Sequence, residues 1–228
     1  IRYKIIIIKI ITLLKKFIQI LPYNENNWIE SQFSNITIKI RGTGIKNVFS
    51  PNNDFESIYY PDTIYINGIK QGIVNNSYYF NQSENNVKLI WNNNINNCQY
   101  MFHNCYDIME FDLSSFDTSE CTSMWAMFEY LSSLTSLNLS NFNTSKVTSF
   151  RYMFHNCSSL ISLNLSSFNT LKVESIYMMF QNCTNLEYIN LQNFDENNLT
   201  SYNDMFDNVP NNVVICINEE KTKTKIFP

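Results

Sequence analysis

Met153-Phe154-His155-Asn156-Cys157 is the stretch of sequence from which the organisation of this chain can be worked out. Its Met-Phe pair returns every 26 residues, at Met101-Phe102, Met127-Phe128, Met153-Phe154, Met179-Phe180 and Met205-Phe206. A strict period over several copies is typical of a repeat array, in which each unit buries its apolar side against the next unit. The sequence therefore predicts stacked 26-residue coils over residues 98–217.

Each repeat carries two apolar patterns. Residues 160–165 (LISLNL) follow an L-x-x-L-x-L pattern, in which alternate residues of a short strand face the core. After a turn at Phe168, a second set of apolar residues recurs at helical spacing: Val173, Ile176, Phe180 and Cys183. The predicted fold class is an α/β repeat solenoid. It would be a leucine-rich-repeat-like array of about five 26-residue coils, each with a short strand and a short helix.

Columns of equivalent residues indicate what holds the coils together. An aromatic ladder is predicted through Phe102, Phe128, Phe154, Phe180 and Phe206. Cys157 and Cys183 share a second column with Leu131 and Val209, so these cysteines are expected to act as small buried apolar residues. They belong to adjacent coils, so a disulfide between them is geometrically allowed, but the pattern does not require one.

The other cysteines divide into two groups. Cys98, Cys105 and Cys121 also share columns with apolar residues, so we expect them to be buried. Cys216 falls in the outward-facing column of the strands and should be the most exposed of the six. The abundance of asparagine is attributed here to composition bias and is given no structural meaning.

The segments outside the repeats are expected to be of three kinds. Residues 31–97 should form a β-rich N-terminal cap, because 36–40 alternate strictly and Asn67-Gly68 is a strong hairpin turn. Residues 1–30 are either a remnant of an export signal or an ordinary strand or helix. Residues 218–228 are expected to be a C-terminal tail that covers no apolar face, with the natural protein continuing beyond it.

Charge argues against binding to nucleic acid, and hydropathy argues against a membrane span. The repeats 98–209 contain three basic residues against twelve acidic ones, and such a surface repels nucleic acid. No uninterrupted apolar run approaches the roughly 18 residues of a membrane span, so no transmembrane segment is predicted.

The outward side of the predicted strands is the expected binding surface, because it lines the concave side of such arrays. It is polar and nearly free of aromatic anchors, so a solvated face with an asparagine ladder is an equally simple interpretation. A partner should contact Tyr188, Glu110 and Asp112 first. The full set of candidate residues is Glu110, Asp112, Ser136, Asn138, Ser162, Asn164, Tyr188 and Asn190.

No catalytic, cofactor or metal site is predicted. His103 and His155 share a column with Glu129, Gln181 and Asp207, and this variation among polar residues indicates solvent exposure. The two histidines are two coils apart, about 10 Å, which is too far to share a metal ion. Several N-x-S/T sequons are glycosylation candidates if the host is a secreting eukaryote: Asn35, Asn75, Asn81, Asn138, Asn143, Asn156, Asn164, Asn182 and Asn198.

Two successive units, LTSLNLSNFNTSKVTSFRYMFHNC (Leu134–Cys157) and LISLNLSSFNTLKVESIYMMFQNC (Leu160–Cys183), resemble the BspA-like leucine-rich repeat family. The resemblance covers about half of the chain. It implies a right-handed solenoid, exposed on the surface or secreted, of a bacterium or unicellular eukaryote. It also implies adhesion to host or matrix proteins, with no catalytic residue to carry over. The last coil departs from the pattern, because Val209 replaces the cysteine and Pro210 follows.

Two functions are compatible with these patterns. The first is a non-enzymatic, cell-surface or secreted module that binds a protein or glycan and is a monomer. The alternative is an intracellular scaffold for protein–protein interaction, in which reduced cysteines would be natural.

Overall fold

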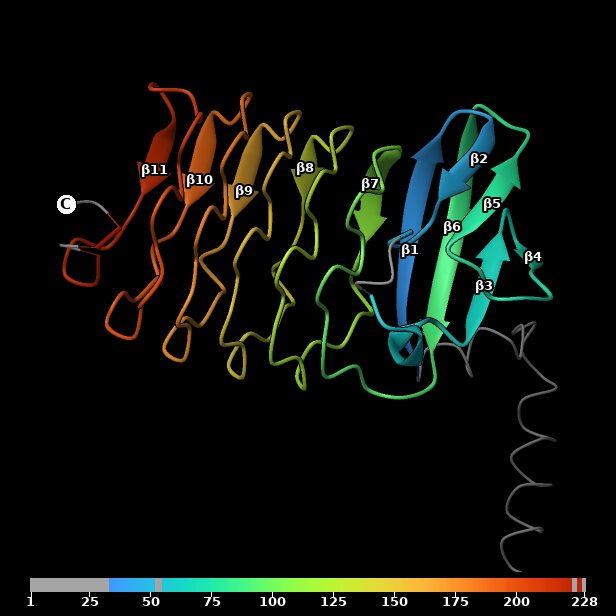
Figure 1. Cartoon of the computed structure of the whole chain (residues 1–228), viewed down its shortest axis with the longest axis horizontal. Coiled ribbons are helices and arrows are strands. Elements are labelled where there is room, and N and C mark those ends of the chain that lie inside the picture. The colour runs from blue at the N-terminus through green and yellow to red at the C-terminus, as the bar shows by residue number, and fades with distance from the viewer. Residues whose placement is uncertain (1–32, 52–54, 223–224, 227–228) are drawn as a thin grey trace, which may run out of the picture. The chain divides into compact units, whose positions relative to one another are not determined.

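The computed structural model describes residues 33–51, 55–222 and 225–226, and Figure 1 shows their arrangement. From Ser34 onward the chain forms one compact unit. The expectation for residues 1–30 lies outside the described residues.

The described part of the chain begins with two antiparallel sheets. The larger has the strand order β4-β3-β6-β1-β7, and the smaller pairs β2 with β5. Alternation in β1 buries Ile36, Ile38 and Ile40 completely, as their period-two spacing requires. The strands are β1 (Ser34–Arg41), β2 (Gly44–Asn47), β3 (Thr63–Ile66), β4 (Ile69–Lys70), β5 (Ser77–Phe80), β6 (Glu84–Trp91) and β7 (Ile108–Asp112).

The predicted hairpin at Asn67-Gly68 is confirmed. Strands β3 and β4 pair antiparallel on either side of it, and both turn residues have positive φ, 49° and 82°. The β-rich cap also contains the short 3-10 helix η1 at Ser57–Tyr59.

The repeats form a second sheet, which is parallel and in register. Its order is β11-β10-β9-β8 (Figure 1), and its register places Leu137 beside Leu163 and Leu163 beside Ile189. These leucine and isoleucine side chains point into the core, while residues on either side point outward. The strands are β8 (Ser136–Leu137), β9 (Ser162–Asn164), β10 (Tyr188–Asn190) and β11 (Val214–Cys216).

The predicted α/β fold class is wrong, because the described chain is β-rich and no coil contains the expected helix. The segment around Met101-Phe102 consists of turns. Its amides bond across to the following coil at every second residue, which is the pattern of a β ladder. The bonds run from Cys98 N to Ser123 O (3.1 Å), Tyr100 N to Trp125 O (2.9 Å), Phe102 N to Met127 O (2.9 Å) and Asn104 N to Glu129 O (3.1 Å).

Backbone dihedrals explain why no helix forms. Each Met-Phe segment holds two non-glycine residues with φ between 52° and 64°, one before the methionine and one four positions later. A right-handed helix needs negative φ throughout, so such a pair stops it. Overlapping i→i+3 turns reproduce the apolar spacing that suggested a helix, for example Met101 N to Cys98 O and His103 N to Tyr100 O. The positive-φ pairs are Tyr100 and Asn104, Ala126 and Tyr130, Tyr152 and Asn156, Met178 and Asn182, and Asp204 and Asn208.

Asparagine has a structural role in the turns, so composition bias alone does not explain its abundance. Where each strand ends, the side-chain oxygen of Asn138, Asn164 or Asn190 accepts a hydrogen bond from the amide two residues on. Asn143 and Asn169 close a second corner in the same way. Asparagine favours such turns because its short amide side chain can replace a backbone acceptor. Its abundance is therefore partly periodic.

Aromatic and polar side chains both join successive coils. Phe154 stacks on Phe128 and on Phe180, each with ring centroids 5.7 Å apart and interplanar angles of 11° and 4°. The hydroxyl of the buried Thr144 accepts a hydrogen bond from Asn169 N and donates one to Asn169 O, in the next coil. Thr118 makes the same two bonds with Asn143, and Thr170 makes them with Asp195.

The expectation that the tail covers no apolar face is also wrong. Ile226 is 9% exposed and belongs to the core. The ammonium of Lys225 donates to the carbonyls of Glu196 (3.0 Å), Asn197 (3.2 Å) and Leu199 (2.8 Å). These contacts satisfy carbonyl groups that follow the Phe194 corner.

Replacing Phe154 with alanine should lower the free energy of unfolding by about 3–5 kcal/mol, because it opens a cavity in a fully buried stack. Urea denaturation of the full chain measures this change. Leu171→Ala is the control, since that side chain is 58% exposed and its loss should cost little. Equal effects of the two substitutions would contradict the buried position of the ladder.

Candidate functional site

The predicted binding residues are divided between two sheets. Glu110 and Asp112 lie on β7, which pairs with β1 in the antiparallel sheet, whereas the other six lie on or directly after β8–β10. Glu110 is also engaged by Lys39, at 3.2 Å. We therefore restrict the name strand face to the outward residues of the parallel sheet: Ser136, Asn138, Ser162, Asn164, Tyr188, Asn190, Val214 and Cys216.

The Asx residues of the candidate set are partly committed to their own turns. Asp112 accepts from the Ser114 hydroxyl (2.6 Å) and amide (3.0 Å), and these hydrogen bonds lower the pKa of the Asp112 carboxyl. The side-chain oxygens of Asn138, Asn164 and Asn190 are occupied by turn amides. A ligand on the strand face would therefore meet mainly the amide N–H groups of these asparagines.

An exposed apolar pair interrupts this polar surface. Tyr188 stands beside Val214 in register, and the two side chains are 36% and 57% exposed. Ile161, 43% exposed, precedes β9 and lines a groove of about 460 Å³ together with Thr135, Ser159, Thr184 and Glu187. Apolar side chains framed by polar ones are typical of protein and glycan contact sites.

The six cysteines are placed differently from one another. Cys216 is confirmed as the most exposed, because it alone is partly exposed while the other five are buried. It pairs in register with Asn190. A hydrogen bond with the Cys216 thiol, followed by desolvation, raises the pKa of Tyr188.

Cys98 and Cys121 form a disulfide with their Cα atoms 6.3 Å apart. The pattern of columns missed it, because Cys98 shares a column with Met124 and Cys121 shares one with Val147. Cys157 and Cys183 are free thiols that donate to the carbonyls of Phe128 and Phe154, at 3.0 and 3.1 Å. Burial raises the pKa of Cys157 well above its ordinary value and that of Cys183 to about 12.

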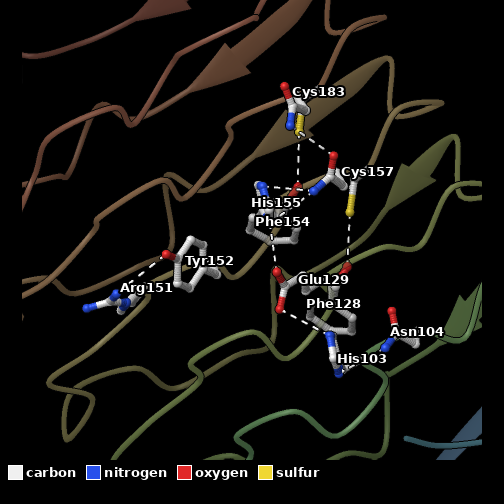
Figure 2. A network of polar contacts seen from close by, with 12 residues as sticks. His103, Asn104, Phe128, Glu129, Arg151, Tyr152, Phe154, His155, Cys157 and Cys183 are labelled. Carbon is white, nitrogen blue, oxygen red and sulfur yellow. Dashed lines mark hydrogen bonds and ion pairs between the residues drawn. The ribbon is translucent and has the colours of Figure 1, made fainter. Parts of the chain in front are cut away.

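The histidine column is not solvent-exposed as predicted. Glu129 is only 8% exposed and lies between two histidines from the coils on either side, as Figure 2 shows. One carboxylate oxygen is 2.7 Å from His155 Nδ1, and the other is 3.4 Å from His103 Nε2. The polar residues of this column therefore contact the equivalent residues of neighbouring coils. Gln181 and Asp207 do so as well, through a 2.9 Å hydrogen bond.

Both nitrogens of His155 are occupied. Nδ1 faces Glu129 (Figure 2), and Nε2 lies 2.8 Å from the side-chain nitrogen Nδ2 of Asn156. The rings of Tyr130 and Tyr152 lie against this imidazole, with centroids 5.5 and 5.2 Å away. Burial, then the charge of Glu129, raises the pKa of Tyr130. An imidazole held in this way has no nitrogen left for a substrate. His103, Glu129 and His155 therefore act as a structural link between three successive coils.

Two features are absent from the residues that the structure describes: a metal-binding group and a membrane-spanning helix. Those residues contain no group of three or more His, Cys, Asp or Glu side chains that could hold a metal ion. They also include no helix of the length and apolar character that crossing a membrane would need.

Comparison with known proteins gives one match. A family model described as "Mycoplasma protein of unknown function, DUF285" matches residues 43–136 and again residues 96–215, so the two matches together span 43–215. Searches of curated proteins and of solved structures found no match.

Alkylation of the native protein with iodoacetamide at pH 8 should label Cys216 first. The thiols of Cys105, Cys157 and Cys183 are buried, and burial raises the pKa of each, so little thiolate is present at that pH. Peptide mass spectrometry over a time course identifies the first labelled site. Earlier labelling of any buried cysteine would contradict these positions, and Cys216→Ser is the control that should abolish the fast phase.

Proposed function

Because the chain belongs to the DUF285 family, whose function is unknown, we propose its function from its surface: it is a non-enzymatic binding module. The strand face contacts a protein or glycan, and the coils act as a rigid scaffold. The observation that carries this proposal is the exposed pair of Tyr188 and Val214 in an otherwise polar sheet face.

The surroundings of that pair suit recognition. Tyr188 supplies a large contact surface with few rotatable bonds, and aromatic side chains of this kind dominate binding energy at interfaces. Asn190 ends the strand that carries Tyr188, and Asn164 ends the neighbouring strand β9. Their oxygens are already fixed by turns, so the N–H groups are held in place for an acceptor. Ile161 and the groove beside it, which is lined by Thr135 and Glu187 of the neighbouring coils, extend the surface across three coils.

The disulfide supports a cell-surface or secreted location. Disulfides persist in oxidising compartments and are rare in the cytosol. The bond between Cys98 and Cys121 therefore favours export over the alternative of an intracellular scaffold. The resemblance to BspA-like repeats supports the same proposal and adds adhesion to host or matrix proteins. We propose that the module acts as a monomer.

Two measurements on the full chain test this proposal. The first is location: surface biotinylation of intact cells should label the protein, and denatured protein should show four free thiols, since two of the six cysteines are joined. Detection only in the cytosol with six free thiols would favour the intracellular scaffold.

The second measurement is binding to immobilised matrix proteins and to a glycan array. Tyr188→Ser should weaken the binding found by about tenfold or more, because it removes an exposed aromatic anchor. Tyr79→Ser is the matched control, as Tyr79 is 74% exposed on β5, outside the strand face. Equal binding by the wild type and the Tyr188→Ser variant would refute the strand face as the contact surface.

A further inference from the structure

A second surface, on another side of each coil, centres on Arg151. This residue stands two positions before the methionine of its repeat, in a column with Gln99, Trp125, Tyr177 and Asn203. The carbon at the centre of its guanidinium lies 5.4 Å from the Trp125 ring centroid and 4.7 Å from that of Tyr177. Aromatic rings of the preceding and the following coil therefore flank the cation. Tyr152, which lies beside Arg151 in Figure 2, is a third neighbour, with its ring centroid 4.9 Å from the same carbon.

The guanidinium has rings around it but no anion. Its hydrogen bond is a long one, from Nη2 to the Tyr152 hydroxyl at 3.4 Å, and no ion pair joins it to a carboxylate of the described residues. Lys146, in the same coil, pairs with Glu120 at 2.7 Å. Two buried donors in this cluster, Arg151 Nε and Trp125 Nε1, have no partner in the described structure. Buried donors are nearly always paired, so these two nitrogens are exceptions to the usual pattern.

Stacking leaves the useful part of the guanidinium available. A ring against the planar face of arginine orients the group but leaves its in-plane N–H donors free. Two parallel N–H groups match the two oxygens of a carboxylate. Because Arg151 Nε is buried, the fork that this partly exposed side chain can present consists of the two terminal nitrogens, Nη1 and Nη2.

The flanking rings continue along the coils. Tyr100 packs against Trp125 with ring centroids 5.4 Å apart, and Tyr152 packs edge-on against Tyr177 at 5.5 Å. We name the partly exposed set Tyr100, Trp125, Arg151, Tyr152 and Tyr177 the aromatic stripe. Aromatic walls with a few placed polar groups are the usual lining of small-ligand sites.

We propose that the aromatic stripe binds a sugar that carries one carboxylate, such as a uronic acid residue in a glycan. The carboxylate pairs with Arg151, and the C–H face of the sugar ring lies on Trp125 or Tyr177. A single carboxylate on a sugar ring, whose C–H face is apolar, fits better than an acidic peptide segment. The repeats 98–209 carry twelve acidic residues against three basic ones and would repel a ligand with several charges.

This site does not depend on the proposed function of the strand face. Its residues stand one or two positions before the methionines of the Met-Phe turns, whereas the strand face lies on β8–β11. Tyr188→Ser and substitutions of Arg151 should therefore affect different ligands, and either proposal can fail alone.

The test is an NMR titration of the full chain with three small probes: methyl β-D-glucuronide, methyl β-D-glucoside and N-acetylglutamate N-methylamide. The glucuronide should shift the indole N–H resonance of Trp125, assigned with a Trp125→Phe variant, while the other two probes should shift it little. This comparison uses the wild type, so it stands even if an Arg151 variant does not fold.

Arg151→Gln should weaken glucuronide binding by at least about tenfold, the value expected for loss of a charge-assisted pair. Arg151→Lys should lose most of it too, because lysine has no planar fork. Lys172→Gln removes the same charge from an exposed position outside the stripe and should change nothing. Equal binding of the glucoside, tighter binding of the glutamate probe, no shift at all, or unchanged binding by Arg151→Gln would each overturn the proposal.

Discussion

Everything in the repeat region depends on where the amides of the Met-Phe turn send their hydrogen bonds. Alternate amides donate to carbonyls of the following coil, and the amides between them donate to carbonyls three residues back, not four residues back as in an α-helix. This choice sets the spacing of the coils, and the spacing lets Phe128, Phe154 and Phe180 stack as nearly parallel rings. It also brings Glu129 between His103 and His155, which are two coils apart.

Residues in the left-handed backbone conformation allow these hydrogen bonds to reach the next coil, and asparagine adopts that conformation at little cost. A residue at φ near 60° turns the chain so that alternate amides point along the stack. Asn104, Asn156, Asn182 and Asn208 occupy one of the two left-handed columns, and asparagine adopts this conformation more readily than most residues. Asn182 Nδ2 donates to Asn156 Oδ1 (3.0 Å) and Asn208 Nδ2 to Asn182 Oδ1 (2.8 Å), so the side chains also form a ladder.

The sequence predicted some features of this structure well and could not predict others. The strand pattern around Leu163 and the Asn67-Gly68 hairpin follow from alternation and from turn chemistry, and both are present. The helix was wrong because overlapping turns space buried residues as a helix does, so periodicity cannot separate the two. Asparagine recurring at Asn156 and Asn182 was the available signal for the turns.

The candidate surfaces show the same limit. Exposure of Tyr188 could be predicted from strand alternation, because its neighbour Ile189 faces the core. The aromatic stripe could not be predicted in this way. It depends on contacts between different coils, as when Arg151 meets Trp125 and Tyr177, and these require the direction of side chains in a turn of unusual backbone. Both surfaces lie on backbone that neighbouring coils hold in place, which favours recognition with little reorganisation.

The relative stability of Asn182→Gly and Asn182→Val tests the left-handed turn most directly. Both substitutions remove the same side-chain hydrogen bonds, so their difference reports the backbone conformation at this position. With φ at 61°, the valine variant should unfold about 1–2 kcal/mol more easily than the glycine variant in urea. A helical residue would reverse the order, because valine is a better helix former than glycine. A valine variant as stable as the glycine variant, or more stable, would contradict the account.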